Sequence, residues 1–194
     1  GIDASAEEVT SDLQEMFNYV NNFRQSSETW YYNPDGTKMN CTGLENLVYD
    51  DNLQKKAMIR AHELADAHAA LGRTMSYLSW FTHTSPSDAN KDLGENIAYG
   101  SGSLGSAANI FAGWQETNEP YSGQGHRRNM LGIIDNNGTV NNFTYTTIGI
   151  GHVEEDNHHY WVQLFGNLDT SWNASEHVKP AESDITPTPT GPPT

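Results

Sequence analysis

Imidazole and carboxylate side chains are the groups in this chain that could bind a metal ion or transfer protons. The eight histidines are His62, His68, His83, His126, His152, His158, His159 and His177. His62 begins HELAD, which differs from the zinc-protease pattern H-E-x-x-H because Asp66 stands where the second histidine is needed. His68 is six residues from His62, so the two histidines would not lie on the same side of a helix. This stretch is therefore interpreted as a solvated helix face, and His158 and His159 as exposed residues flanking a hairpin turn.

His83, Glu95 and His126 have the more informative contexts. His83 lies in FTHTSP, His126 lies in GQGHRRNML, and Glu95 lies in GENIAYG, bracketed by a glycine and by apolar residues. This bracketing predicts a partly buried carboxylate, and a buried carboxylate needs partners. His83, His126 or a metal ion could supply them. Ser85 lies near His83, but no pattern gives it a role as a nucleophile.

Composition excludes several classes of function. The formal charge of −15 disfavours nucleic acid and anionic lipid as partners. No apolar run approaches the roughly 20 residues that cross a membrane. Cys41 is the only cysteine, so an internal disulfide and a cysteine-based zinc site are both excluded.

Helical patterns fill the first two thirds of the chain. A capping box at Ser5 and Glu8 is followed by apolar residues at helical spacing: Val9, Leu13, Met16, Phe17, Val20 and Phe23. A loop built on Asn-Pro-Asp-Gly follows. The second expected helix has an apolar side of Leu53, Ala57, Ile59, Leu64 and Ala67 and ends at Gly72. A third helix is expected over about Ser106 to Glu116, capped by Ser103 or Ser106, and a fourth near Gly125.

Two strands are predicted near the end of the chain. TYTTIGIGHVEE and HHYWVQLFG are rich in β-branched, aliphatic and aromatic residues and are joined by a short hairpin connection. NNGTVNN before them is expected to be a loop, and Gly149 and Gly151 are expected to allow close packing against a helix. Helices followed by antiparallel strands indicate an α+β fold.

The last residues differ in composition from the rest. The stretch 179–194 is rich in proline and threonine, which predicts an extended tail or linker after a single domain of residues 1–178. Such a tether suits a secreted or cell-surface protein, so we expect a signal peptide in the precursor upstream of Ile2. We expect a monomer.

Four motifs together resemble the CAP superfamily of cysteine-rich secretory, antigen 5 and pathogenesis-related 1 proteins. They are FTHTSP, GENIAYG, GWQETNEPYSGQGHRRNML and IGIGHVEEDNHHYWVQLFG, in this order. The likeness covers about Glu8 to Gly166, and the lack of paired cysteines suits a bacterial member. The resemblance implies a three-layer α-β-α sandwich with a central antiparallel sheet. It also implies a cleft lined by two histidines and two acidic residues.

The resemblance assigns the cleft to His83, Glu95 and His126, with Glu116 as the fourth residue and Glu119 as the alternative. The arginines after His126 are then expected to be scaffolding. Two neutral imidazoles can bind Zn²⁺ and leave open positions for water, so His83 and His126 are the candidate ligands of zinc or another divalent cation.

Three functions remain open on the sequence. The first is a secreted binding module with a metal in its cleft and an extracellular ligand, whether lipid, glycan or protein. The second is a metal-assisted hydrolase of the peptidase kind, in which a carboxylate takes a proton from water. The third is an inert structural or adhesive module, whose histidines and glutamates form a closed hydrogen-bonded network. A shared fold does not by itself show that a protein catalyses a reaction.

Overall fold

A computed structural model describes residues 9–136, 139–141 and 145–167. Several predicted features therefore lie outside the described residues: the Ser5 and Glu8 capping box, His177, and the 179–194 tail with its boundary. The first helix begins only at Ser11, because Val9 and Thr10 are not helical. No helix in the described ranges is both long and apolar enough to cross a membrane.

Four α-helices and eight strands make up the described fold. In chain order they are α1 (Ser11–Arg24), β1 (Trp30–Tyr32), β2 (Lys38–Asn40), β3 (Val48–Tyr49), α2 (Asp51–Ala70), β4 (Gly94–Ser101), α3 (Ala107–Gln115), α4 (Gly125–Leu131), β5 (Ile134–Asn136), β6 (Thr139–Asn141), β7 (Thr147–Glu155) and β8 (His158–Gly166). Short 3₁₀ turns, η1 (Gly102–Gly105) and η2 (Tyr121–Gly123), precede α3 and α4.

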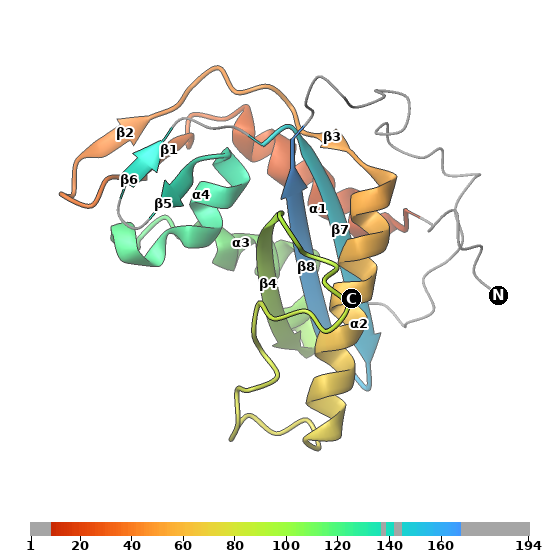
Figure 1. Ribbon diagram of the computed structural model, residues 1–194. Coiled ribbons are helices and arrows are strands. Elements are labelled where there is room, and N and C mark those ends of the chain that lie inside the picture. The colour runs from red at the N-terminus through yellow and green to blue at the C-terminus, as the bar shows by residue number, and fades with distance from the viewer. Residues whose placement is uncertain (1–8, 137–138, 142–144, 168–194) are drawn as a thin grey trace.

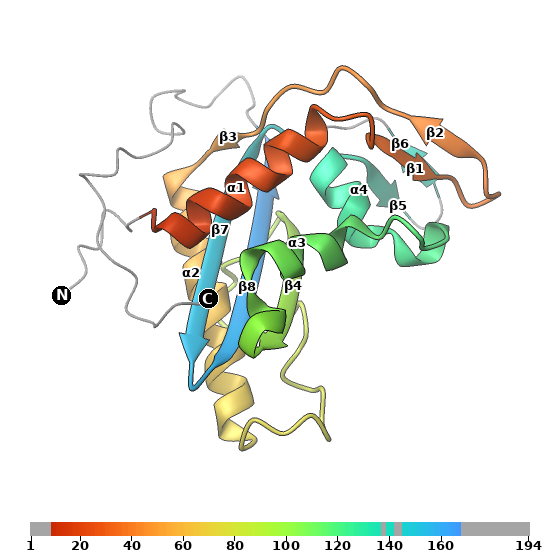
Figure 2. The same cartoon turned by 180° about the vertical axis from the view of Figure 1, so that it is seen from behind.

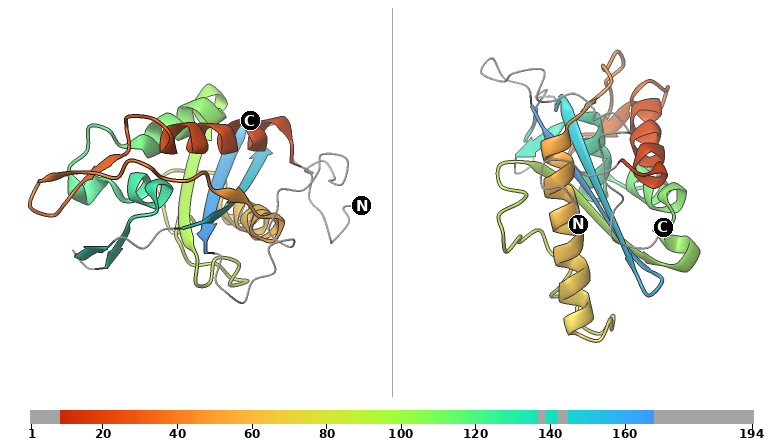
Figure 3. Two further views of the ribbon diagram at one scale, coloured as in Figure 1. Left: turned by 90° about the horizontal axis from the view of Figure 1, so that it is seen from above. Right: turned by 90° about the vertical axis from the view of Figure 1, so that its right-hand side faces the viewer.

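The elements form the three-layer α-β-α sandwich that the sequence predicted. The central sheet has the order β3-β7-β8-β4, with antiparallel pairing except for the short parallel pair of β3 and β7. Helix α2 covers one face, and α1 and α3 cover the other (Figures 1, 2 and 3). Helix α4 and the two small hairpins form a lobe beside the end of the sheet where β4 begins (Figure 1).

Two glycines set the distance between α2 and the sheet. A Cβ atom on Gly149 would lie 2.1 Å from the Leu53 carbonyl carbon, and one on Gly151 would lie 2.2 Å from the Ala57 carbonyl oxygen. Only a residue without a side chain fits such a contact between strand and helix. The prediction of close helix packing at these glycines is confirmed.

Helix α2 begins and ends where its sequence indicates. The Asp50 side chain caps it by accepting from the backbone N–H groups of Asn52 and Leu53. Gly72, just past the end, has a left-handed φ of 71°. The prediction that Ile59 faces the core is wrong: Ile59 is 46% exposed, while its neighbour Arg60 is buried. The buried stripe follows Leu53, Ala57, Met58, Ala61, Leu64, Ala65 and His68, which turns Ile59 outward.

Strands form in two predicted loops and in one stretch without a predicted element. Residues 94–101, for which the sequence predicted no element, form β4 and pair along their whole length with β8. The Asn-Pro-Asp-Gly stretch is the turn of the β1–β2 hairpin, and the NNGTVNN stretch contributes to the β5–β6 hairpin. Strands of three residues are too short to show a reliable alternation.

The expectation that the remaining histidines are solvated is wrong for His68 and His159. His68 is fully buried, stacks on Trp80 at 3.9 Å between ring centroids, and has Nδ1 2.7 Å from the Tyr160 hydroxyl. His159 is 4% exposed and packs against His152 of the neighbouring strand. Their positions on α2 and β8 point inward, and aromatic neighbours from other elements complete their burial.

Candidate functional site

His83 and Glu95 form the first half of the site. The His83 Nδ1 atom lies 2.6 Å from Oε1 of Glu95, and the side chains are 65% and 4% exposed, respectively. Glu95 is the second residue of β4, and His83 lies in the loop that leads from α2 to this strand. Since an ionised carboxylate can only accept, Nδ1 donates the hydrogen. The other ring nitrogen, Nε2, is the one left for a ligand.

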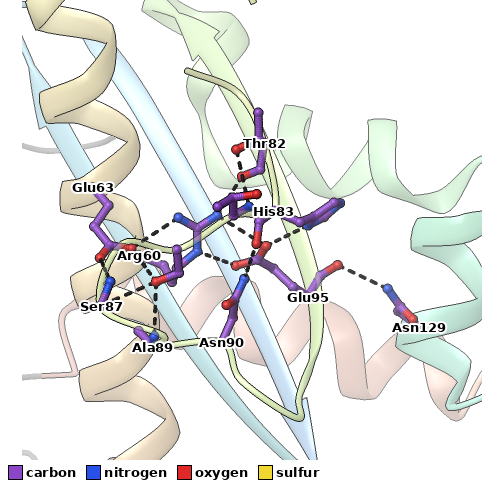
Figure 4. Close-up of polar contacts among 11 residues, drawn as sticks. Arg60, Glu63, Thr82, His83, Ser87, Ala89, Asn90, Glu95 and Asn129 are labelled. Carbon is purple, nitrogen blue, oxygen red and sulfur yellow. Dashed lines mark hydrogen bonds and ion pairs between the residues drawn. The ribbon is translucent and has the colours of Figure 1, made fainter. Parts of the chain in front are cut away.

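The His83 loop is held by polar contacts at several points (Figure 4). Asn90 Nδ2 donates to the His83 carbonyl at 2.8 Å, and Arg60 Nη2 donates to the Thr82 carbonyl at 2.8 Å. The Ser85 hydroxyl donates to Glu63 at 2.7 Å and accepts from the Ala89 backbone N–H. Ser85 is therefore a structural residue of the loop, with its hydroxyl engaged away from His83.

A buried arginine, Arg60, forms an ion pair with the Glu95 carboxylate. Burial raises the pKa of this carboxyl, but the hydrogen bonds from His83 and Arg60 and the charge of Arg60 outweigh burial and lower the pKa below its usual value. Arg60 is 1% exposed and donates to Glu95 through Nε at 2.6 Å and Nη2 at 3.3 Å. The carboxylate next to His83 is thus kept charged in the protein interior.

His126 and Glu116 form the second half. The His126 Nδ1 atom lies 2.6 Å from Oε2 of Glu116, with the side chains 37% and 13% exposed. His126 is the second residue of α4, and Glu116 directly follows α3 in a left-handed conformation with a φ of 50°. The Arg127 backbone N–H donates to the other carboxylate oxygen at 3.0 Å. A non-glycine residue with positive φ costs free energy, and such residues often occur at functional sites.

The two halves open into one cavity of about 490 Å³. Its walls include His83, Glu95, Glu116 and His126, together with Asn96, Ser122, Gly123, Gly125, Arg128, Asn129, Ile133 and Tyr145. Two amides bridge the halves: Asn129 Nδ2 donates to the Glu95 carbonyl and to Asn96 Oδ1, and Asn96 Nδ2 donates to the His126 carbonyl at 3.2 Å. These amides therefore join β4, which carries Glu95, to α4, which carries His126.

All four residues that the sequence proposed for the cleft line this cavity. The alternative, Glu119, lines a neighbouring cavity beside Glu116 instead. The sequence analysis missed Asn96 and Asn129, although each lies in a quoted motif, GENIAYG and GQGHRRNML, beside a proposed residue. It also missed Arg60, whose only local signal is its place on the buried side of α2.

Both arginines after His126 bind backbone carbonyls, as scaffolding residues would, and Arg128 also lines the cavity. Arg127 is fully buried, and its guanidinium donates to the carbonyls of Glu28, Trp30 and Gln115. Arg128 donates to the Tyr121 carbonyl at 2.7 Å and packs over the Tyr121 ring. Both therefore fix α4 to its surroundings.

The comparisons with known proteins agree with this fold. The three layers and the paired histidine–carboxylate cleft define an α-β-α sandwich protein of the CAP type. The family model described as "CAP: Cysteine-rich secretory protein family" matches residues 17–165, and the chain belongs to this family. No curated protein sequence gives a significant match.

Solved structures resemble the chain at low sequence identity. An outer surface protein from Borrelia burgdorferi is 18% identical, with a TM-score of 0.50 over 84% of this chain and 98% of its own. The structure of NaASP2 with Zn²⁺ is 18% identical, with a TM-score of 0.49 over 93% and 88% of the respective chains. Schistosoma mansoni venom allergen-like protein 4 is 14% identical, with a TM-score of 0.48 over 90% and 98%. The match to the Borrelia burgdorferi protein, at 18% identity, supports the fold alone.

Proposed function

We propose that this chain is an extracellular binding module whose cleft holds a divalent metal ion, zinc foremost, through His83 and His126. One observation carries the proposal: each ring binds a carboxylate through Nδ1, and both rings line the same cavity. A carboxylate on the second ring nitrogen is the common arrangement of histidines that ligate metals, because it fixes the tautomer and the ring orientation.

The donor set fits an open metal site. Within the described residues, no group of three or more histidine, cysteine, aspartate or glutamate side chains is arranged to hold a metal. In the proposal, His83 and His126 are the two protein ligands, and water or donor atoms of a bound ligand complete the coordination. Zinc at such a site would supply a Lewis acid that attracts oxygen or nitrogen donors. With only two protein donors, we expect weaker zinc binding than at a site with three or four.

The engaged carboxylates favour binding over hydrolysis. A metal-assisted hydrolase needs a base placed to take a proton from water. Glu95 and Glu116 each already accept a hydrogen bond from a histidine ring, and Glu95 also pairs with Arg60. Their role in the proposal is to orient the rings. The ligand is a molecule outside the cell, of lipid, glycan or protein class, with a donor group that reaches the metal.

A secreted or cell-surface location is part of the proposal. The family description includes secretory proteins, and residues 179–194 have the composition of a tether. A formal charge of −15 argues against nucleic acid as a partner.

Calorimetric titration of the untagged protein with zinc tests the proposal. We expect the parent to bind zinc. His83→Ala and His126→Ala should lose zinc binding and keep the circular dichroism spectrum of the parent. His62→Ala is the matched control, because His62 is a half-buried histidine of α2 that does not line the cavity. If His83→Ala and His126→Ala titrate like the parent, the two pairs are a closed hydrogen-bonded support of the cleft. Turnover of a peptide and ester panel by the zinc-loaded protein would favour the hydrolase.

A further inference from the structure

Arg60 connects α2 to both members of the His83 half of the site without lining the cavity itself. Its guanidinium donates to Glu95 through Nε at 2.6 Å and Nη2 at 3.3 Å, and Nη2 also reaches the carbonyl of Thr82 at 2.8 Å. Thr82 directly precedes His83 in the chain. One buried side chain thus contacts the carboxylate that holds the His83 ring and the backbone that carries it (Figure 4).

The hydrogen bonds from Arg60 determine which Glu95 oxygen binds the His83 ring. Oε2 takes the short bond from Arg60 Nε, and Oε1 is shared between Arg60 Nη2 and His83 Nδ1. A planar guanidinium that donates through two nitrogens orients a carboxylate, whereas a lysine ammonium acts as a single point charge. Arg60 is itself held by Glu63, which accepts from Nη1 at 3.2 Å.

The position of His83 makes such support necessary. The His83 side chain is 65% exposed and lies in a loop without helix or strand, so packing restrains it little. His126 differs, because it lies in α4, and its partner Glu116 is held by the Arg127 backbone N–H in place of a side-chain cation. The two halves of the cleft are therefore built differently, and His126 serves as an internal reference.

We infer that Arg60 is a positioning residue for the ligand site: by orienting Glu95 and the Thr82 carbonyl, it holds His83 with Nδ1 protonated and Nε2 directed at the ligand. The inference rests on the proposed function where it concerns metal affinity. The tautomer and order of the His83 ring belong to the metal-free protein and can be measured without zinc.

The test compares Arg60→Lys with the parent in two measurements. Long-range ¹H–¹⁵N spectra of the histidine rings report the tautomer, and calorimetry reports zinc affinity. In Arg60→Lys we expect His83 to become a mixture of tautomers, with the His126 signals unchanged. Zinc affinity should fall by at most about 10- to 100-fold, the effect of losing a direct partner of a metal ligand, because Arg60 acts on His83 through Glu95 and Thr82. Arg24→Lys is the matched control, because Arg24 is equally buried but contacts neither Glu95 nor Thr82: it donates to the carbonyls of Glu45 and Met130, two residues that do not line the cavity. It should change neither measurement.

The outcomes separate this inference from the proposed function. An unchanged His83 spectrum in folded Arg60→Lys overturns the role of Arg60, whatever the zinc affinity. A parent that binds no zinc overturns the proposed metal site, while the tautomer measurement still decides the role of Arg60. If Arg60→Lys does not fold, Glu63→Gln replaces it, since this change removes the ion pair with Arg60 while the glutamine can still hydrogen-bond the Ser85 hydroxyl of the His83 loop. It should shift the His83 tautomer in the same direction by a smaller amount, and an unchanged spectrum there would equally overturn the inference.

Discussion

His152 of β7 and His159 of β8 lie edge to edge in the interior, with Nε2 of the first 2.9 Å from Nδ1 of the second. Their ring planes are within 10° of parallel, and His152 also stacks on Trp161. Asp12 of α1 accepts from Nδ1 of His152, and Glu154 lies 4.0 Å from Nε2 of His159. Since Nδ1 of His152 donates to a carboxylate, its Nε2 can accept from His159 only while His152 is neutral.

The buried histidine pair predicts loss of stability in mild acid. Burial lowers the pKa of His152 to about 3 and that of His159 to about 4, from a usual value of 6.5. The unfolded chain therefore takes up protons first as the pH falls, and the stabilisation is complete only above about pH 6.5. We expect the free energy of unfolding to fall by a few kcal/mol as the pH drops from about 6.5 to 4. Chemical denaturation across this range measures it.

His159→Gln provides the specific test of that pH dependence. A glutamine amide can still donate to His152 but does not titrate, so the slope of stability against pH should become shallower. His62→Gln, on the outer side of α2, is the control and should leave the slope as in the parent. An equal slope in all three proteins would mean that other groups, such as the carboxylates, govern acid unfolding.

Gly151→Ala should destabilise the fold. The new Cβ would lie 2.2 Å from the Ala57 carbonyl oxygen, so α2 must move away from β7. We expect a cost of about 1–3 kcal/mol or more in the free energy of unfolding, measured in urea. Gly113→Ala in α3 is the control, because no atom lies within 4 Å of its new Cβ. This change should instead stabilise by about 0.5–1 kcal/mol through helix propensity. Equal effects of the two changes would contradict the close packing described here.

The two carboxylates of the cleft, Glu95 and Glu116, should contribute differently to the free energy of unfolding. Glu95→Ala leaves the buried guanidinium of Arg60 without its main counter-ion, which we expect to cost about 3–5 kcal/mol. Glu116→Ala removes the acceptor of one backbone N–H and one ring nitrogen, which we expect to cost about 1–3 kcal/mol. Urea denaturation of both variants compares them. A larger cost at Glu116 would show that the Arg60 pair stabilises less than its burial indicates.

Zinc affinity should weaken as the solution is made acidic. Protons compete with the metal for the same imidazole lone pairs, so the loss should be progressive between about pH 8 and 5. Calorimetry in two buffers of different ionisation enthalpy would also count the protons released on binding. A zinc affinity independent of pH over this range would point to carboxylate rather than histidine ligands.

The sequence indicated the helices and the long β7–β8 hairpin because their signals are local. Apolar residues along one side predict α2, Ser106 is a predicted cap of α3, and the short stretch between the two apolar runs predicts a hairpin, whose Asp156 and Asn157 have positive φ angles. It did not predict β4, because a single short run with two glycines fits a loop as well as a strand. The pairing partner β8 lies about 60 residues further on and supplies the ladder that makes the run a strand.

The four cleft residues followed from the family resemblance of the ordered motifs, and the tertiary structure gives the contacts that hold them. His83 reaches Glu95 across 12 positions, and His126 reaches Glu116 across 10. Arg60 reaches Glu95 across 35 positions, and its only local signal is its place on the buried side of α2. Local spacing determines which face of an element a side chain occupies. Only the packing of α2 against the sheet determines which buried charges meet, because a buried guanidinium and carboxylate are stable only when the whole fold brings them together.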